Sequence, residues 1–157
     1  MEATTAIDLA QLEARVSRLE DLDGIWRLFQ DYRRHLDQRD FAAYSQLFAA
    51  DGEWIGNLGR GKGPVEIEAL LTRTLEVYPD DSTRTLHLVD NPVIEVDGDR
   101  ATATSTWVYI ERDEEDRPYL SLIGHYEDVL TRAGGRWKFQ RRVAYLDFPY
   151  EAPAFAL

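Results

Sequence analysis

The second half of the chain consists of four long runs of residues that favour β-strands, and short turn sequences separate these runs. They cover residues 83–96, 100–112, 119–132 and 136–147. Between them, "VDGD" and "AGG" are typical of hairpin turns, and "DEEDRP" is typical of a charged turn. Because each short turn joins two neighbouring strands, the sequence predicts three successive antiparallel hairpins.

The first half of the chain shows helical periodicity instead. The sequence "SRLE" at residues 17–20 has the pattern of a capping box and predicts the start of a long first helix. Asp40 is predicted to cap a shorter second helix, and a short strand is expected at residues 53–57. The sequence "GRGKGP" is expected to form a loop that leads into a third helix at residues 65–77.

The separation of helices from strands predicts an α+β fold, in which about three helices pack on one face of a curved antiparallel sheet. A length of 157 residues indicates a single domain. We expect an N-terminal arm at residues 1–16 and a folded domain at residues 17–147. The apolar tail at residues 148–157 is expected to dock on this domain or on a neighbouring subunit.

The composition disfavours several kinds of partner. A net charge of -11 disfavours nucleic acid and anionic membranes, because binding phosphate groups needs positive charge. The absence of cysteine excludes disulfides, Cys-ligated metals and a thiol nucleophile. The sequence has no signal-peptide pattern, and no run reaches the roughly 20 apolar residues that a membrane helix needs. We therefore expect a cytoplasmic protein with no membrane or nucleic-acid partner.

The sequence has no familiar motif for a metal, a nucleotide or a nucleophilic serine. Its three histidines, at positions 35, 87 and 125, form no HxxxH or HExxH pair. "GRGKGP" lacks the spacing of a phosphate-binding loop, and neither GxGxxG nor GxSxG occurs. We expect no metal and no cofactor, with a three-histidine site built from distant elements as the alternative.

Several side chains could instead perform acid–base chemistry: Tyr32, Asp37, His87, Tyr109, Tyr126 and Arg142. His87 lies at the start of a long strand, and a carboxylate on one imidazole nitrogen would fix its tautomer and raise its basicity. Asp37 could supply that carboxylate. The alternative is a hydrogen-bonded core histidine and an ordinary helix-end aspartate. His35 is expected to be exposed to solvent, and His125 is expected to face away from any pocket.

Strand alternation indicates an aromatic wall. The side chains that share a face are Trp107 and Tyr109 on one strand, and Leu122, Gly124 and Tyr126 on the next. Gly124 marks a bend or a close approach. Such a wall suits a flat apolar ligand, and the alternative is a dry aromatic core. On the closing strand Arg141 and Arg142 face opposite sides, so only one of them points inward.

Together these elements resemble the SnoaL-like branch of the nuclear transport factor 2-like (NTF2-like) superfamily over residues 17–147. The resemblance lies in "YRRHLD", "FAAYSQLFAADGEW", "GRGKGPVEIEALL", "LHLVDNPVIEVDGDRATATS" and "GGRWKFQRRVAYLD". It implies a cone-shaped sheet that encloses a deep pocket. The sequence is most similar to the group of scytalone dehydratase, bile acid 7α-dehydratase and hexachlorocyclohexane dehydrochlorinase, which are cofactor-free lyases with an Asp–His pair.

The resemblance assigns roles to particular residues. The family aspartate falls on Asp37 and the family histidine on His87. The tyrosine five residues before the aspartate falls on Tyr32, and the arginine five residues after Trp137 falls on Arg142. The pocket positions fall on Trp54, Trp107, Tyr109, Leu122, Gly124 and Tyr126. The second strand histidine of scytalone dehydratase is missing, which argues against scytalone as the substrate.

The resemblance therefore implies a lyase that performs a dehydratase-type elimination on a cyclic, mostly apolar small molecule, as a homodimer or homotrimer. His87 would remove a carbon-bound proton, Tyr32 or Tyr109 would bind an oxygen, and Arg142 would stabilise negative charge. Because Tyr32 and Asp37 lie about 140° apart around an ideal helix, both face the site only if the helix unwinds near Leu36. The alternatives are an isomerase, a polyketide-cyclase-like enzyme with the same pocket, and a non-catalytic binding domain.

Overall fold

The computed structural model describes residues 8–75 and 85–149. The helices are α1 (Leu9–Asp37), α2 (Phe41–Ser45) and α3 (Gly63–Leu75). The strands are β1 (Phe48–Gly56), β2 (Gly59–Lys62), β3 (Thr85–Asp97), β4 (Arg100–Arg112), β5 (Pro118–Ala133) and β6 (Arg136–Pro149). Three helices packed on a curved sheet confirm the predicted α+β class.

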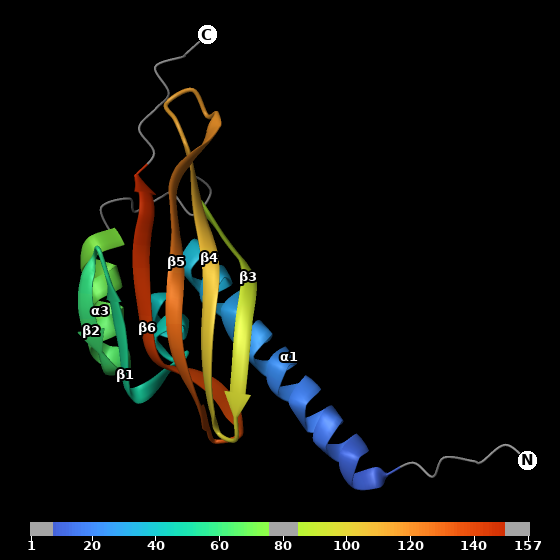
Figure 1. Cartoon of the computed structure of the whole chain (residues 1–157). Coiled ribbons are helices and arrows are strands. Elements are labelled where there is room, and N and C mark those ends of the chain that lie inside the picture. The colour runs from blue at the N-terminus through green and yellow to red at the C-terminus, as the bar shows by residue number, and fades with distance from the viewer. Residues whose placement is uncertain (1–7, 76–84, 150–157) are drawn as a thin grey trace, which may run out of the picture.

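All six strands form one sheet in the order β2-β1-β6-β5-β4-β3. Strands β3 to β6 follow one another as three antiparallel hairpins, as the turn sequences predict. The sheet is mixed rather than wholly antiparallel, because β6 pairs with β1 in parallel. After β1 the chain passes through β2 and α3 to the far edge at β3, and it then returns strand by strand until β6 meets β1 (Figure 1).

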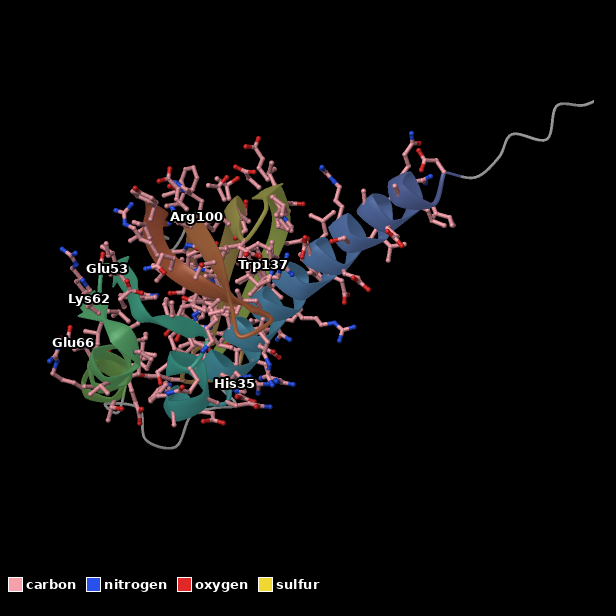
Figure 2. All side chains as sticks on the ribbon, turned by 90° about the horizontal axis from the view of Figure 1, so that it is seen from below. His35, Glu53, Lys62, Glu66, Arg100 and Trp137 are labelled. Atoms are coloured by element: carbon pink, nitrogen blue, oxygen red, sulfur yellow. The ribbon has the colours of Figure 1, made fainter. Side chains whose placement is uncertain are left out.

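Helix α1 crosses behind the sheet and extends past its β3 edge (Figure 1). It begins at Leu9, where Asp8 caps it by accepting a 3.0 Å hydrogen bond from the Ala10 amide. The predicted start at Ser17 is wrong, because Asp8 provides an earlier cap. Residues 8–20 are all exposed, and Figure 2 shows this half of the helix standing clear of the domain. No helix in the two described ranges is long and apolar enough to cross a membrane.

The sequence "GRGKGP" is not the plain loop that we expected. Gly59–Lys62 forms β2 and pairs with β1. A side chain at Gly61 would place its Cβ 3.0 Å from the Cα of Ile67, so glycine allows β2 to lie directly against α3. At the other end of the chain, the predicted docking of the tail falls largely on residues 150–157, which lie outside the described residues.

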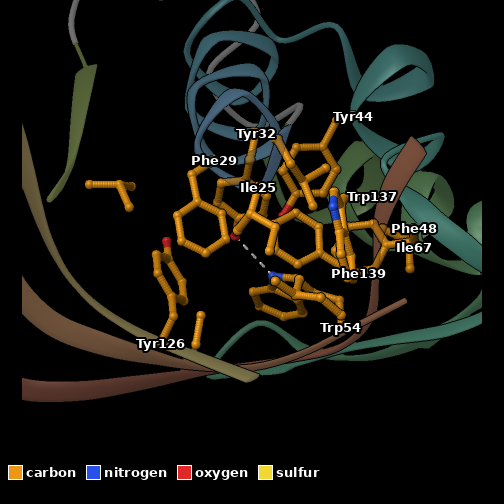
Figure 3. Packing of buried hydrophobic residues seen from close by; sticks show 14 of the residues in the cluster. Ile25, Phe29, Tyr32, Tyr44, Phe48, Trp54, Ile67, Tyr126, Trp137 and Phe139 are labelled. Carbon is orange, nitrogen blue, oxygen red and sulfur yellow. Dashed lines mark hydrogen bonds between the residues drawn. The ribbon is translucent and has the colours of Figure 1, made fainter. Parts of the chain in front are cut away.

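Aromatic rings fill the space between α1, α2 and the inner face of the sheet (Figure 3). Neighbouring rings have centroids 4.7 to 5.9 Å apart and belong to Phe29, Tyr32, Tyr44, Phe48 and Phe139. All five side chains are buried. Because large rings contribute much of the hydrophobic stabilisation of a core, this packing holds the C-terminal half of α1 firmly on the sheet.

Candidate active site

The C-terminal end of α1 positions the acidic residue of the site. The Arg39 amide donates to the Leu36 carbonyl at 3.1 Å, and the Asp40 amide donates to the His35 carbonyl at 2.9 Å. This pairing is a Schellman motif, and Arg39 takes the left-handed conformation that the motif requires (φ 57°). The chain therefore leaves the helix immediately after Asp37, and Asp40 then caps α2 as predicted.

Asp37 and His87 are in direct contact. Oδ1 of Asp37 lies 2.7 Å from Nδ1 of His87 and also accepts a 3.0 Å hydrogen bond from the His87 amide. The two side chains are mostly buried, at 12% and 17% exposure. An ionised carboxylate can only accept hydrogen bonds, so the contact with an ionised Asp37 favours the neutral tautomer with its proton on Nδ1, which leaves the lone pair of Nε2 free. Nη1 of Arg33 lies 3.5 Å from Oδ2 of Asp37 and adds a positive charge behind the pair.

The helix does not unwind near Leu36, so that prediction is wrong. Helix α1 stays α-helical to Asp37. Tyr32 and His87 lie on the wall of a cavity, whereas Asp37 lies behind His87 and does not line it. Because Asp37 acts on the imidazole and not on the cavity itself, Tyr32 and Asp37 need not share one face of the helix.

The cavity has a volume of about 140 Å³. The sequence-predicted residues that line it are Tyr32, Trp54, His87, Trp107, Tyr109, Leu122 and Tyr126. The imidazole of His87 lies 4.5 Å from the ring of Tyr109, its partner across the β3–β4 ladder. The aromatic and aliphatic side chains around this imidazole suit a small apolar molecule.

Gly124 shapes the cavity without lining it. Trp107 lies directly opposite in the β4–β5 register, and a Cβ on Gly124 would stand 2.4 Å from Cζ2 of Trp107 and 1.9 Å from the Tyr145 carbonyl oxygen. Glycine thus allows the indole to lie across β5, where its Nε1 donates to the His125 carbonyl at 3.2 Å. The structure contains the predicted close approach at Gly124, and Trp107 makes it.

Three tyrosines form one side of the cavity. The ring of Tyr32 lies 4.7 Å from that of Tyr44 and 5.5 Å from that of Tyr126. Its hydroxyl accepts a 3.1 Å hydrogen bond from Nε1 of Trp54, drawn as the dashed line in Figure 3. Burial raises the pKa of Tyr44 and of Tyr126 well above the usual tyrosine value. These phenols therefore stay protonated at neutral pH, and they can donate hydrogen bonds but not act as bases.

Tyr109 is also a neutral donor beside His87. Burial raises the pKa of its hydroxyl, although a hydrogen bond with Thr85 and the charge of Arg39 partly oppose the rise. The site thus places one imidazole beside at least one phenol that stays protonated at neutral pH.

Arg142 faces inward and Arg141 is exposed, as the family resemblance implies, whereas strand alternation predicted only that the two face opposite sides. The expected place of Arg142 on the cavity wall is nevertheless wrong. Its guanidinium is fully buried and makes two 2.7 Å hydrogen bonds to Asp128, beneath the rings of Tyr32 and Tyr126. Burial disfavours the charged form, but Asp128 outweighs it and keeps the pKa of Arg142 above its ordinary value. Arg142 supports the tyrosines that form the wall.

Arg39 lines the cavity, and the sequence analysis missed it. Its Nη1 donates to the Leu75 carbonyl at 2.7 Å. Glycine or asparagine is usual at the left-handed position after a helix, so no sequence pattern marks an arginine there as part of a site.

The other histidines lie outside the cavity wall. Nδ1 of His125 lies 2.8 Å from Oδ2 of Asp147, and both side chains are partly exposed. His35 is less exposed than expected, with 17% of its side chain accessible. Within residues 8–75 and 85–149, no three histidine, aspartate or glutamate side chains lie close enough together to hold a metal ion.

Residues 17–143 match the model of a protein family described as the SnoaL-like domain. This range begins within α1 and ends within β6, so it contains both Asp37 and His87. A comparison with curated proteins finds no match.

Many solved structures share the fold. An NTF2-like protein with a cystatin-like fold from Novosphingobium aromaticivorans is 27% identical with a TM-score of 0.80, over 88% of this chain and 90% of that chain. A putative scytalone dehydratase from the same organism is 26% identical with a TM-score of 0.69, over 87% and 92%. LinA is 22% identical with a TM-score of 0.69, over 91% and 98%, which shows the fold alone. The predicted NTF2-like fold is confirmed.

Proposed function

This chain belongs to the SnoaL-like domain family, and we propose that it is a cofactor-independent lyase that eliminates water from a cyclic, mostly apolar small molecule. The observation that carries the proposal is the 2.7 Å contact between Asp37 and His87, with His87 on the wall of an aromatic cavity. A positioned imidazole with one nitrogen free is what general-base catalysis near neutral pH requires.

In this reaction Nε2 of His87 takes a proton from a substrate carbon. The electrons of that C–H bond form the new double bond, and the C–O bond on the neighbouring carbon breaks. Asp37 stabilises the imidazolium through the hydrogen bond at Nδ1. The hydroxyl of Tyr109 donates a hydrogen bond to a substrate oxygen, and the proton on His87 passes to the leaving hydroxyl, which departs as water.

The strength of the base limits the substrate. A neutral imidazole removes a carbon-bound proton efficiently only where the resulting negative charge can spread onto an oxygen, as it does next to a carbonyl group. The substrate class that fits is therefore a cyclic ketone with a hydroxyl group on the β-carbon. Trp54, Trp107 and Leu122 offer the flat apolar surfaces against which such a ring can pack.

The similarity to a putative scytalone dehydratase supports elimination over the other reactions of this fold. In the proposed enzyme Arg142 is a positioning residue, because it touches the backs of Tyr32 and Tyr126 and not the cavity. This assignment replaces the direct stabilisation of negative charge that the sequence led us to expect.

The proposal is tested by incubating the purified protein with a panel of cyclic β-hydroxy ketones and measuring product mass. Loss of water is the expected result. A rearranged product that keeps the elements of water, and that gains one deuterium at the α-carbon when the reaction runs in heavy water, would instead identify an isomerase.

Variants then connect the activity to the site. Asp37→Asn should lower turnover by on the order of a hundredfold, and His87→Gln should lower it at least as much. The double variant should be scarcely worse than the worse single variant, because the two residues act as one unit. The matched control is His125→Gln, which removes the other Asp-paired imidazole and should leave turnover unchanged. Full turnover in His87→Gln would contradict the proposal.

A further inference from the structure

Among the arginines that the structure describes, Arg39 alone combines partial burial with the lack of a carboxylate partner. Its side chain is partly buried and lines the cavity. Its hydrogen bond goes to a backbone carbonyl, and no aspartate or glutamate of the described ranges forms an ion pair with it. The remaining arginines without such a pair in these ranges are exposed. A partly buried cation without a counter-ion is unfavourable unless a ligand supplies the negative charge.

The local structure holds this guanidinium in place. Nη1 is fixed at 2.7 Å from the carbonyl of Leu75, the last residue of α3. This neutral acceptor fixes the group without cancelling its charge. Nε is buried and has no hydrogen-bond partner within residues 8–75 and 85–149. The backbone of Arg39 is left-handed (φ 57°), where an L side chain is disfavoured, so a purely structural turn would suit glycine better.

The charge lies close to the proposed base. Arg39 and Tyr109 line the same cavity, and the charge of Arg39 acts on the Tyr109 hydroxyl. The Tyr109 ring in turn lies 4.5 Å from the His87 ring. A ligand whose ring packs on the aromatic wall can therefore reach His87 with one part and Arg39 with another.

We infer that Arg39 determines the specificity of this cavity by binding a carboxylate on the substrate, so that the substrate is a cyclic, mostly apolar acid. The inference rests on the proposed function for the reaction at His87, but binding at Arg39 can be measured without it. The protein carries a net charge of -11, which opposes anions over most of its surface. A preference for an anion over its neutral analogue therefore needs a local cation such as Arg39.

The test compares 2-naphthoate with 2-naphthamide, which have the same ring and similar shape but differ in charge. Isothermal titration calorimetry gives the dissociation constant of each with the whole protein. The wild-type chain should bind the carboxylate at least about tenfold more tightly, as expected for a charge-assisted hydrogen bond. Arg39→Gln should abolish this preference. The matched control is Arg34→Gln, which removes the same charge from an exposed site near the end of α1 and should change the ratio by less than about twofold.

Three results would overturn the inference: no carboxylate preference in the wild-type protein, an unchanged preference in Arg39→Gln, or an equal loss in Arg34→Gln. If Arg39→Gln lacks a native near-ultraviolet circular dichroism spectrum, Arg39→Gly is measured instead, because glycine accepts the left-handed backbone. A carboxylate preference without dehydration of any cyclic β-hydroxy ketone, with or without a carboxylate group, would refute the proposed function and leave this inference standing. Dehydration that depends on His87, without a preference for the carboxylate, would overturn this inference and leave the proposed function standing.

Discussion

Asp128→Asn should destabilise the protein by about 3–5 kcal/mol, because it removes the counter-ion of a buried guanidinium. The side chains of Asp128 and Arg142 are both 0% exposed and are joined by two hydrogen bonds of 2.7 Å. Asparagine keeps one acceptor oxygen but turns an NH₂ group toward a guanidinium N–H, so two donors face each other. In a protein of typical stability, about 5–15 kcal/mol, this is a large loss.

The aromatic rings around Arg142 do not prevent that loss. Its guanidinium carbon lies 4.1 Å from the ring centroid of Tyr32 and 4.0 Å from those of Tyr126 and Phe139. Cation–π attraction in a desolvated site is worth about 2 kcal/mol, which is less than the cost of burying an unpaired charge. The rings therefore favour the place of Arg142 but cannot replace Asp128.

Urea unfolding followed by tryptophan fluorescence measures the change in the free energy of unfolding. The control is Asp23→Asn, which breaks an ion pair of 2.8 Å with Arg27 on the surface and should cost about 0.5 kcal/mol or less. Asp128→Leu combined with Arg142→Met should recover most of the stability, since well-packed apolar residues can replace a buried pair. A cost for Asp128→Asn as small as that of the control would refute the reasoning.

Three further predictions concern the wall, the buried tyrosines and the N-terminal helix. Gly124→Ala should cost at least about 1–3 kcal/mol, because the new Cβ would lie 1.9 Å from the Tyr145 carbonyl oxygen; a thermal midpoint equal to that of the wild type would contradict this. Tyr44→Phe should move alkaline unfolding to higher pH. Burial raises the pKa of Tyr44 in the folded state. The protonated phenol therefore contributes fully to stability below the unfolded-state pKa of about 10, and this contribution is lost as pH rises toward the folded-state pKa. Urea midpoints that fall at the same alkaline pH in Tyr44→Phe and in the wild type would argue against this prediction. Deletion of residues 1–16 should leave the urea midpoint nearly unchanged, because residues 8–16 are exposed, and a large drop would show that this segment belongs to the folded unit.

The hairpins could be predicted because their signals are local. "VDGD" and "AGG" specify tight turns and "DEEDRP" a charged turn wherever the flanking residues favour strands, and the three hairpins of β3 to β6 follow from these turns. Strand alternation likewise indicated the face on which Trp107 and Tyr109 lie. The contact between Asp37 and His87 joins residues 50 positions apart, and the family resemblance suggested it where periodicity alone left it open.

Other features depended on contacts that no local pattern encodes. The family resemblance indicated that Arg142 faces inward but not how deeply it is buried, because Asp128 lies beside it on β5 and holds it behind the cavity wall. The parallel pairing of β6 with β1 depends on the path of the whole chain. No sequence pattern indicated Arg39, because its place on the cavity wall depends on a contact between the end of α1 and the end of α3.

The claim that Asp37 prepares His87 as a base is tested most directly by the ¹⁵N chemical shifts of the imidazole nitrogens, with the resonances of the three histidines assigned through His35→Gln and His125→Gln. In the neutral ring of the wild-type protein, Nδ1 of His87 should carry the proton and Nε2 should be unprotonated. In Asp37→Asn this preference should weaken or reverse, because an amide can also donate to Nδ1. A wild-type His87 with its proton on Nε2 would contradict the account, because the nitrogen meant to accept the substrate proton would already be occupied.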